Sequence, residues 1–243
     1  MKKPAVLASK KKSSKSPKTP KEKPIRLLDL KVKRQFQTRL LKWYGEYGRD
    51  LPWRRTNDPY RILVSEVMLQ QTQVDRVVPK YHEFLQKYPT VKELAAAEPQ
   101  EVRETWYPLG YNIRPYRLHS IACETVERYG GEIPNNPDDL LSLKGIGRYT
   151  AGAVRSFAFH EDAPILDTNV MRVLHRVFVG EGDPKKQKTR LWAMSEESIP
   201  KGNCYDFNQA LMDFGAMVCT ARKPYCLLCP MQKICKAFPL KFS

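Results

Sequence analysis

Residues 140–151 read Leu-Leu-Ser-Leu-Lys-Gly-Ile-Gly-Arg-Tyr-Thr-Ala, and the interpretation of the rest of the chain starts from this segment. The leucines predict the end of one helix, the glycines a tight turn, and the residues from Arg148 onward the start of another helix. Gly145 and Gly147 let the backbone approach a partner closely, and amide groups at a helix N-terminus suit a phosphate. A Gly-x-Gly turn alone is equally compatible with a plain connection between two helices.

The charge of the chain favours the phosphate interpretation. Its 243 residues include 42 Lys and Arg against 26 Asp and Glu, a formal net charge of +16, so an acidic partner is expected. Half of this charge lies in residues 1–24, which hold nine Lys and one Glu among Ser and Pro. We interpret them as a disordered basic arm that binds phosphates without sequence preference. At the glycine turn, Lys144, Arg148 and Arg155 are expected to assist binding to a DNA backbone.

Export and membrane insertion are not expected. No apolar run reaches membrane-spanning length, and the N-terminus lacks the apolar region of a signal peptide. We therefore expect an intracellular, monomeric protein without membrane contact, located in the cytoplasm and nucleoid or in a nucleus. Disulfides are not expected in that environment.

From about Ile25 the apolar residues recur at helical spacing, and no convincing run of alternating residues separates the segments. Asp58 followed by Pro59 predicts a helix start, and Thr90 with Glu93 has the pattern of a capping box. The chain is therefore predicted to be all-α.

Four cysteines near the end of the chain, Cys219, Cys226, Cys229 and Cys235, follow the pattern C-x6-C-x2-C-x5-C. Four thiolates this close together can hold one metal centre, either a structural zinc ion or a [4Fe–4S] cluster. The spacing does not choose between them. The other two cysteines, Cys123 and Cys204, are expected to be small buried residues.

Two acidic residues have contrasting surroundings. Glu66 lies in the apolar stretch Ile-Leu-Val-Ser-Glu-Val-Met-Leu, where burial favours the protonated form of a carboxyl group. Asp167 lies at a predicted helix N-terminus, where the helix dipole favours the anion. One protonated and one ionised carboxyl group is the arrangement that cleaves glycosidic bonds. The alternatives are a solvated Glu66 and an Asp167 that only caps its helix.

Several motifs together resemble the helix-hairpin-helix DNA glycosylase superfamily, in its iron–sulfur branch, and within it the MutY-like adenine glycosylases. They are the glycine hairpin, the four cysteines, and the segments at 51–55, 65–74, 109–111, 165–173 and 207–216. The resemblance implies two all-α domains with DNA gripped across the cleft between them. By this resemblance, residues 57–167 are expected to form a six-helix barrel with the hairpin at about 139–152. Residues 25–56 and 168–243 are expected to form the iron–sulfur cluster domain.

The resemblance also implies an activity: excision of adenine mispaired with guanine or 8-oxoguanine in double-stranded DNA. Glu66 protonates the flipped adenine at N7, and Asp167 stabilises the sugar cation. The resemblance further implies that Tyr149 and Asn169 support catalysis and that a [4Fe–4S] cluster is held by Cys219, Cys226, Cys229 and Cys235. The residues implied in base and mismatch recognition are Trp53, Arg54, Leu69, Gln71, Leu109 and Tyr111. Those implied in DNA backbone contacts are Lys144, Gly145, Gly147, Arg148, Arg222 and Lys223.

Some features depart from the pattern or limit it. The chain ends at Ser243, so the further domain with which typical relatives recognise 8-oxoguanine is expected to be absent, and residues 110–115 alter the loop near the mismatch. Tyr149 stands where bifunctional relatives such as endonuclease III carry a Schiff-base Lys, so strong lyase activity is not expected. The alternatives are a thymine/uracil glycosylase for G·T and G·U mismatches and a non-catalytic DNA-binding module. Residues 70–72, Gln-Gln-Thr, favour adenine.

Overall fold

The structure is a computed structural model of the chain and describes residues 26–110 and 113–239. The predicted basic arm, residues 1–24, and the proposed mismatch residue Tyr111 therefore lie outside the described residues. The described residues form eleven α-helices and no strand, which confirms the all-α prediction. The helices are α1 (Leu30–Tyr47), α2 (Pro59–Leu69), α3 (Val74–Lys87), α4 (Val91–Ala96), α5 (Pro99–Trp106), α6 (Ile113–Tyr129), α7 (Pro137–Ser142), α8 (Arg148–Ala158), α9 (Thr168–Leu174), α10 (Lys188–Ser198) and α11 (Cys204–Met217). Four short turns are the 3-10 turns η1 (Pro52–Arg54), η3 (Cys226–Leu228) and η4 (Gln232–Ile234) and the π-helical turn η2 (His175–Val179).

Side-chain caps fix the starts of several helices where the sequence predicts them. The carboxylate of Asp58 accepts the backbone N–H groups of Tyr60 and Arg61, with Pro59 as the first residue of α2. Thr90 caps α4 in the same way and bonds the carboxylate of Glu93. These caps satisfy backbone donors that have no partner within the helix, so the polar residue fixes where the helix begins.

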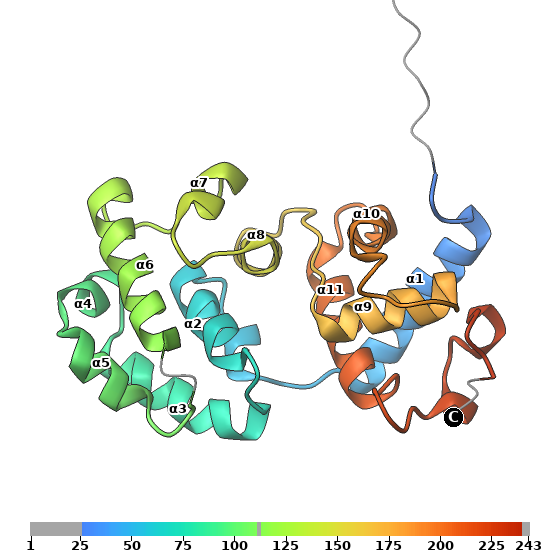
Figure 1. The fold of residues 1–243 in the computed structure, drawn as a ribbon, viewed down its shortest axis with the longest axis horizontal. Helices are drawn as coiled ribbons and strands as arrows, with labels where there is room; N and C mark the ends of the chain where they lie inside the picture. The colour runs from blue at the N-terminus through green and yellow to red at the C-terminus, as the bar shows by residue number, and fades with distance from the viewer. Residues whose placement is uncertain (1–25, 111–112, 240–243) are drawn as a thin grey trace, which may run out of the picture.

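The helices form two groups, with α2–α7 in one and α1, α9, α10 and α11 in the other (Figure 1). The second group joins the two ends of the chain, because α1 packs on α11 through edge-to-face aromatic pairs. Phe36 and Phe207 have ring centroids 6.1 Å apart, and those of Trp43 and Phe214 are 5.3 Å apart. Helix α8 contacts both α2 and α11 and so connects the two groups. The domain boundaries at residues 56/57 and 167/168 stay a prediction.

Over residues 26–110 and 113–239, no helix combines the length and the apolar character needed to cross a bilayer.

Candidate active site

Glu66 lies in the middle of α2, surrounded by apolar residues of the core. Only 4% of the residue is exposed, and the hydroxyl group of Tyr149 donates a hydrogen bond to its carboxyl group. Burial raises the pKa of Glu66 to about 7; the nearby charge of Asp167 adds to this rise, whereas the bond from Tyr149 and the charge of Arg54 oppose it. Glu66 is thus a carboxylic acid that still holds its proton near neutral pH.

Asp167 is the N-cap of α9, as the sequence predicts. Its Oδ1 accepts the backbone N–H of Val170 at 2.7 Å, and its Oδ2 accepts the side-chain amide of Asn169 at 3.1 Å. The N–H groups at the helix terminus favour the anion, as expected, but burial is the larger effect and raises the pKa of Asp167 above its usual value. The bonds from Val170 and Asn169 and the charge of Arg172 oppose that rise and stabilise the ionised form.

Tyr149 and Asn169 support the two acids. Tyr149, on α8, bonds Glu66, and burial together with the charges of Glu66 and Asp167 raises the pKa of its hydroxyl well above the usual value. Asn169 donates to Asp167 and accepts a hydrogen bond of 2.7 Å from Nη2 of Arg172. Because Arg172 can only donate, it fixes which end of the Asn169 amide faces Asp167. Arg172 lies in the segment 165–173 singled out in the sequence, which assigned it no role.

The acids meet because α8 packs unusually close to the segment of chain that leads into Asp167. A Cβ atom at Gly152 would lie 2.2 Å from the carbonyl oxygen of Pro164. Only glycine leaves room for this approach. Gly215 on α11 plays a similar part, since a Cβ there would lie 2.7 Å from Cβ of Asn169.

We expect Gly152→Ala to destabilise the protein by about 1–3 kcal/mol or more, because the methyl group has to push the chain before Asp167 away from α8. Urea denaturation followed by circular dichroism measures the change. Gly45→Ala in α1 is the matched control: no atom lies within 4 Å of the added Cβ, and this exposed helical position should gain roughly 0.5–1 kcal/mol. Equal stability of the Gly152→Ala variant and the natural protein would contradict the close packing.

Trp53 and Arg54, implied as walls of a base pocket, belong to a buried network. Trp53 is 6% exposed and packs edge-on against Tyr81. The guanidinium of Arg54 donates to both carboxylate oxygens of Asp213 at 2.8 Å, and Arg49 bonds the same carboxylate at 2.6 Å. Burial opposes the charge of Asp213, but these bonds outweigh it and keep the pKa of Asp213 below its usual value. Arg54 therefore brings positive charge near Glu66 from within a paired network.

The glycine hairpin is built as the sequence predicts. Gly145 has a φ of +117°, a left-handed conformation that favours glycine, and Gly147 is the N-cap of α8 without any side-chain cap bond. Lys144 is exposed, and so is Arg148, whose guanidinium lies 4.1 Å from the centre of the Trp192 ring. That stacking holds the plane of the guanidinium while leaving its edge free to bind a phosphate. Arg155 is only half-buried on α8, and its charge affects the buried thiol of Cys204.

The residues implied in mismatch recognition are divided between surface and core. Gln71 is exposed and has a φ of +58°, an uncommon conformation for a residue other than glycine. Leu69 is half-buried at the end of α2, and Leu109 is 4% exposed. Tyr111 lies outside the described residues. Arg222 and Lys223, implied to bind the DNA backbone, are exposed between two cysteines.

The four C-terminal cysteines lie near one another and form no disulfide. Burial, aided by the nearby thiols of Cys219, Cys226 and Cys235, raises the pKa of Cys229 to about 11. Among the described residues, no three His, Cys, Asp or Glu side chains are grouped so that they could hold a single metal ion. Four free thiols in one segment are the ligand type of a structural zinc ion or of an iron–sulfur cluster.

Two arginines connect this cysteine segment to α9 and the turn after it. Nε of Arg172 donates to the carbonyl of Cys219 at 2.7 Å, and Nη1 of Arg176 donates to the carbonyl of Thr220 at 2.8 Å. Nη1 of Arg176 also lies 3.5 Å from Sγ of Cys219. The helix that begins at Asp167 is therefore fixed at its other end to the first cysteine.

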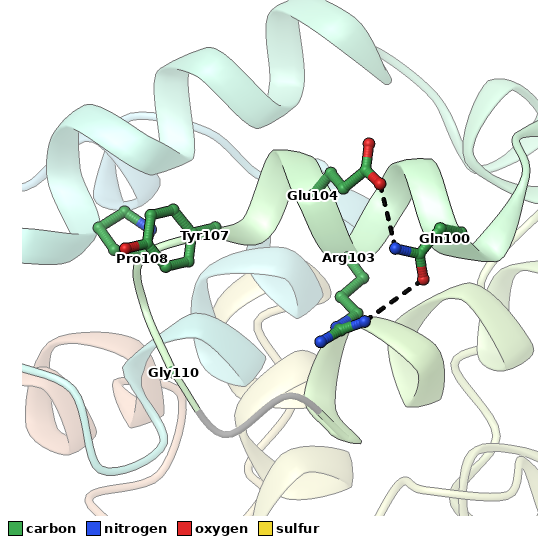
Figure 2. A pocket seen from close by; sticks show the side chains of 6 residues that line it. All are labelled: Gln100, Arg103, Glu104, Tyr107, Pro108 and Gly110. Carbon is green, nitrogen blue, oxygen red and sulfur yellow. Dashed lines mark hydrogen bonds between the residues drawn. The ribbon is translucent and has the colours of Figure 1, made fainter.

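A cavity of about 660 Å³ lies elsewhere, along α5 (Figure 2). None of the residues implied in catalysis lines it. Its lining residues are Gln100, Arg103, Glu104, Tyr107, Pro108 and Gly110, and the side chain of Gln100 bonds both Glu104 and Arg103. The candidate active site is instead the buried contact between α2, α8 and the start of α9.

Comparisons with known proteins agree with this geometry. Residues 64–196 match the model of the "HhH-GPD superfamily base excision DNA repair protein" family. The chain is 43% identical to the adenine DNA glycosylase of Rattus norvegicus over 83% of its own length and 41% of the rat protein. It is 40% identical to the thymine-DNA glycosylase of Aeropyrum pernix over 82% of its own length and 92% of that protein.

A solved structure of a thermostable thymine-DNA glycosylase is also similar, with a TM-score of 0.80 and 35% identity over 86% of this chain and 97% of that one. The chain spans about two fifths of the length of the mammalian adenine glycosylases that it matches. The family expected from the sequence motifs is confirmed: the chain belongs to the HhH-GPD superfamily of base excision DNA repair proteins.

Proposed function

We propose that this protein is a monofunctional DNA glycosylase that hydrolyses the N-glycosidic bond of adenine mispaired with guanine or 8-oxoguanine. The observation that carries the proposal is the meeting of buried Glu66 with half-buried Tyr149 and Asp167. Burial raises the pKa of Glu66 to about 7, so it keeps its proton up to about that pH, whereas Asp167, whose pKa burial also raises, receives hydrogen bonds that stabilise its anion. A pair of carboxyl groups with opposite protonation is what an oxocarbenium-like transition state requires.

The proposed reaction begins outside the base stack, because the glycosidic bond of a stacked base cannot be reached. Glu66 gives its proton to N7 of the flipped adenine, so that the electron pair of the breaking C1′–N9 bond is drawn into the base. The carboxylate of Asp167 stabilises the positive charge that develops on the sugar. Water then adds to C1′ and releases a proton, which leaves free adenine and an abasic sugar. Tyr149 holds Glu66 in place by its hydrogen bond.

DNA binding is proposed for the glycine hairpin and the segment between the first two of the clustered cysteines. Gly145 and Gly147 present backbone amide groups, and Lys144 and Arg148 are exposed beside them. Arg222 and Lys223 add positive charge on the other group of helices. We therefore propose that a single copy of the chain binds double-stranded DNA as its substrate inside the cell.

A [4Fe–4S] cluster is the cofactor that we propose for Cys219, Cys226, Cys229 and Cys235. Relatives of the endonuclease III and MutY type usually carry one, and the four free thiols here suit it. The cluster supplies structural cross-links and positions the segment that carries Arg222 and Lys223. Visible absorption and about four irons per chain are expected of the purified protein; a colourless protein that contains zinc would overturn the assignment.

A thymine or uracil glycosylase is the second candidate, supported by the similarity to the Aeropyrum pernix protein. The identities to the adenine and thymine enzymes, 43% and 40%, are too close to decide. We favour adenine because residues 70–72 read Gln-Gln-Thr, as the resemblance to adenine glycosylases implies. Gln71 among them is exposed.

We expect base release without strand cleavage. Tyr149 cannot form the imine by which bifunctional relatives break the strand. After incubation with an A·G duplex, the labelled strand should therefore break only when heat or alkali is applied, and borohydride should trap no protein–DNA adduct. Strand breaks before alkali, or a trapped adduct, would contradict the monofunctional assignment.

A further inference from the structure

Arg114 is a buried cation that lies away from the two acids. It belongs to α6, and the residue is 3% exposed. The two terminal nitrogens of its guanidinium lie within hydrogen-bond distance of six acceptors, which share their four N–H groups: Nη1 reaches the carbonyl groups of Val67 (3.1 Å), Met68 (2.8 Å) and Gln70 (2.7 Å), and Nη2 reaches Oγ1 of Thr72 (3.1 Å) and the carbonyl groups of Leu109 (2.9 Å) and Gly110 (3.1 Å).

These six acceptors come from two segments that are far apart in the sequence. One is the end of α2 with the loop that follows it, residues 67–72. The other is residues 109–110, which follow α5. Carbonyl groups at the end of a helix have no partner within the helix, so Arg114 satisfies acceptors that would otherwise be left buried without one. A single guanidinium thus fixes the two loops relative to each other.

Each of the two loops contains a residue whose φ lies in the left-handed region, at or next to a residue that Arg114 hydrogen-bonds. Gln71 has a φ of +58° and lies between Gln70 and Thr72, both of which Arg114 bonds. Gly110 has a φ of +72°. The conformation of Gln71 is unfavourable for a residue with a Cβ atom, so it persists only where neighbouring contacts impose it. Arg114 provides those contacts on both sides and leaves the Gln71 side chain exposed.

Two further contacts stiffen the second loop. The guanidinium carbon of Arg114 lies 5.4 Å from the centre of the Trp106 ring, at the end of α5. Nη2 of Arg76 donates to the carbonyl of Pro108 at 2.7 Å. The cavity of Figure 2 is lined by Gly110 of this loop and by Pro108 just before it, so the loop lies at the wall of that cavity.

We propose that Arg114 is a positioning residue that holds both loops, residues 70–72 and 109–110, in the conformation that opens the duplex at the mispair. This inference rests on the proposed function. Extruding a base requires unstacking, and a preformed pair of loops avoids the loss of conformational entropy on binding. Arg114 itself does not touch the reacting base; it acts through the loops that it holds.

The test is Arg114→Lys, which keeps the charge but replaces a planar five-donor group by a point charge that cannot span six acceptors. Single-turnover excision is measured on two duplexes with the same A·G mispair. In one duplex the flanking pairs are complementary; in the other they are mismatched, so the helix is already open. We expect the rate on the first duplex to fall about tenfold or more and the rate on the second to stay within about threefold of the natural protein.

Two measurements separate this role from a general structural one. Arg128→Lys, an exposed position in the last turn of the same helix, is the matched control and should leave both rates unchanged. Fluorescence of 2-aminopurine placed beside the mispair reports opening without any need for excision. It should rise when the natural protein binds and rise much less with the Arg114→Lys variant.

Equal losses of rate on both duplexes, no loss on either, or an undiminished fluorescence rise with the variant would each overturn the inference. If the natural protein excises nothing yet still raises the fluorescence, the proposed function fails, and the comparison of the two fluorescence changes still decides the role of Arg114.

Discussion

Glu66→Gln is expected to abolish base excision, with a single-turnover rate at least about a thousandfold below that of the natural protein. Glutamine has nearly the same size and can accept the hydrogen bond from Tyr149, but it has no acidic proton to give to the leaving base. Rates are measured on an A·G duplex with abasic sites revealed by alkali. Glu127→Gln, an exposed position on α6, is the matched control and should retain full activity. A rate for Glu66→Gln within tenfold of the natural one would remove Glu66 from its proposed role.

The same residue predicts the pH dependence of excision. The pKa of Glu66 is raised to about 7, so the protonated form is lost as the pH rises through that value. Excision should therefore be level in mildly acidic solution and fall about tenfold per pH unit above pH 7 or so.

The free energy of unfolding should also fall as the pH rises. In the unfolded chain Glu66 ionises near its ordinary pKa, whereas the folded protein retains the proton up to about pH 7. The folded state therefore binds more protons in that range, and the contribution of Glu66 to stability is lost as the pH rises from about 4.5 to about 7. Above pH 7 the folded protein has to hold Glu66 buried and ionised, which costs free energy. Glutamine carries no charge, so the Glu66→Gln variant should be more stable above pH 7 by roughly 1–3 kcal/mol while being inactive.

Asp167→Asn should lower the excision rate by about a hundredfold to a thousandfold, because the negative charge that faces the sugar cation is lost. Asparagine is as good an N-cap as aspartate, so the bond to the Val170 N–H and the start of α9 should be kept. The change therefore removes the charge and keeps the cap, but it also removes the acceptor of the Asn169 amide, because the amide nitrogen of the new asparagine would face it.

Asp29→Asn is the matched control for this prediction. Asp29 caps α1 through the N–H groups of Lys31 and Val32, far in the sequence from the two acids. Its substitution should change neither the rate nor the unfolding temperature. If Asp167→Asn kept a rate within threefold of the natural protein, Asp167 would be a cap and nothing more.

Much of the site could be predicted because its signals are local. The apolar neighbours of Glu66 indicate its burial, and the residues after Asp167 indicate a helix start. The sign of the pKa change at Asp167 could not be predicted in this way, since the burial that determines it comes from packing between segments distant in sequence. No local pattern contains that information.

The residues to which the sequence motifs assigned no role act over long distances along the chain. Asp213 pairs with Arg54 across 159 positions, and Arg114 bonds Val67 across 47. Gly152 looks like any small residue of a helix until the carbonyl of Pro164 is seen against it. Each becomes recognisable only when the fold brings its partner near.

A panel of four duplexes tests most directly whether the pair of Glu66 and Asp167 excises adenine. The duplexes carry A·8-oxoguanine, A·G, T·G or U·G at the same position and are treated with excess protein, then with heat or alkali. We predict abasic sites in the adenine strand of the first two duplexes and intact thymine and uracil strands in the others. Abasic sites in the T·G or U·G duplex with the A·G duplex untouched would contradict the adenine assignment.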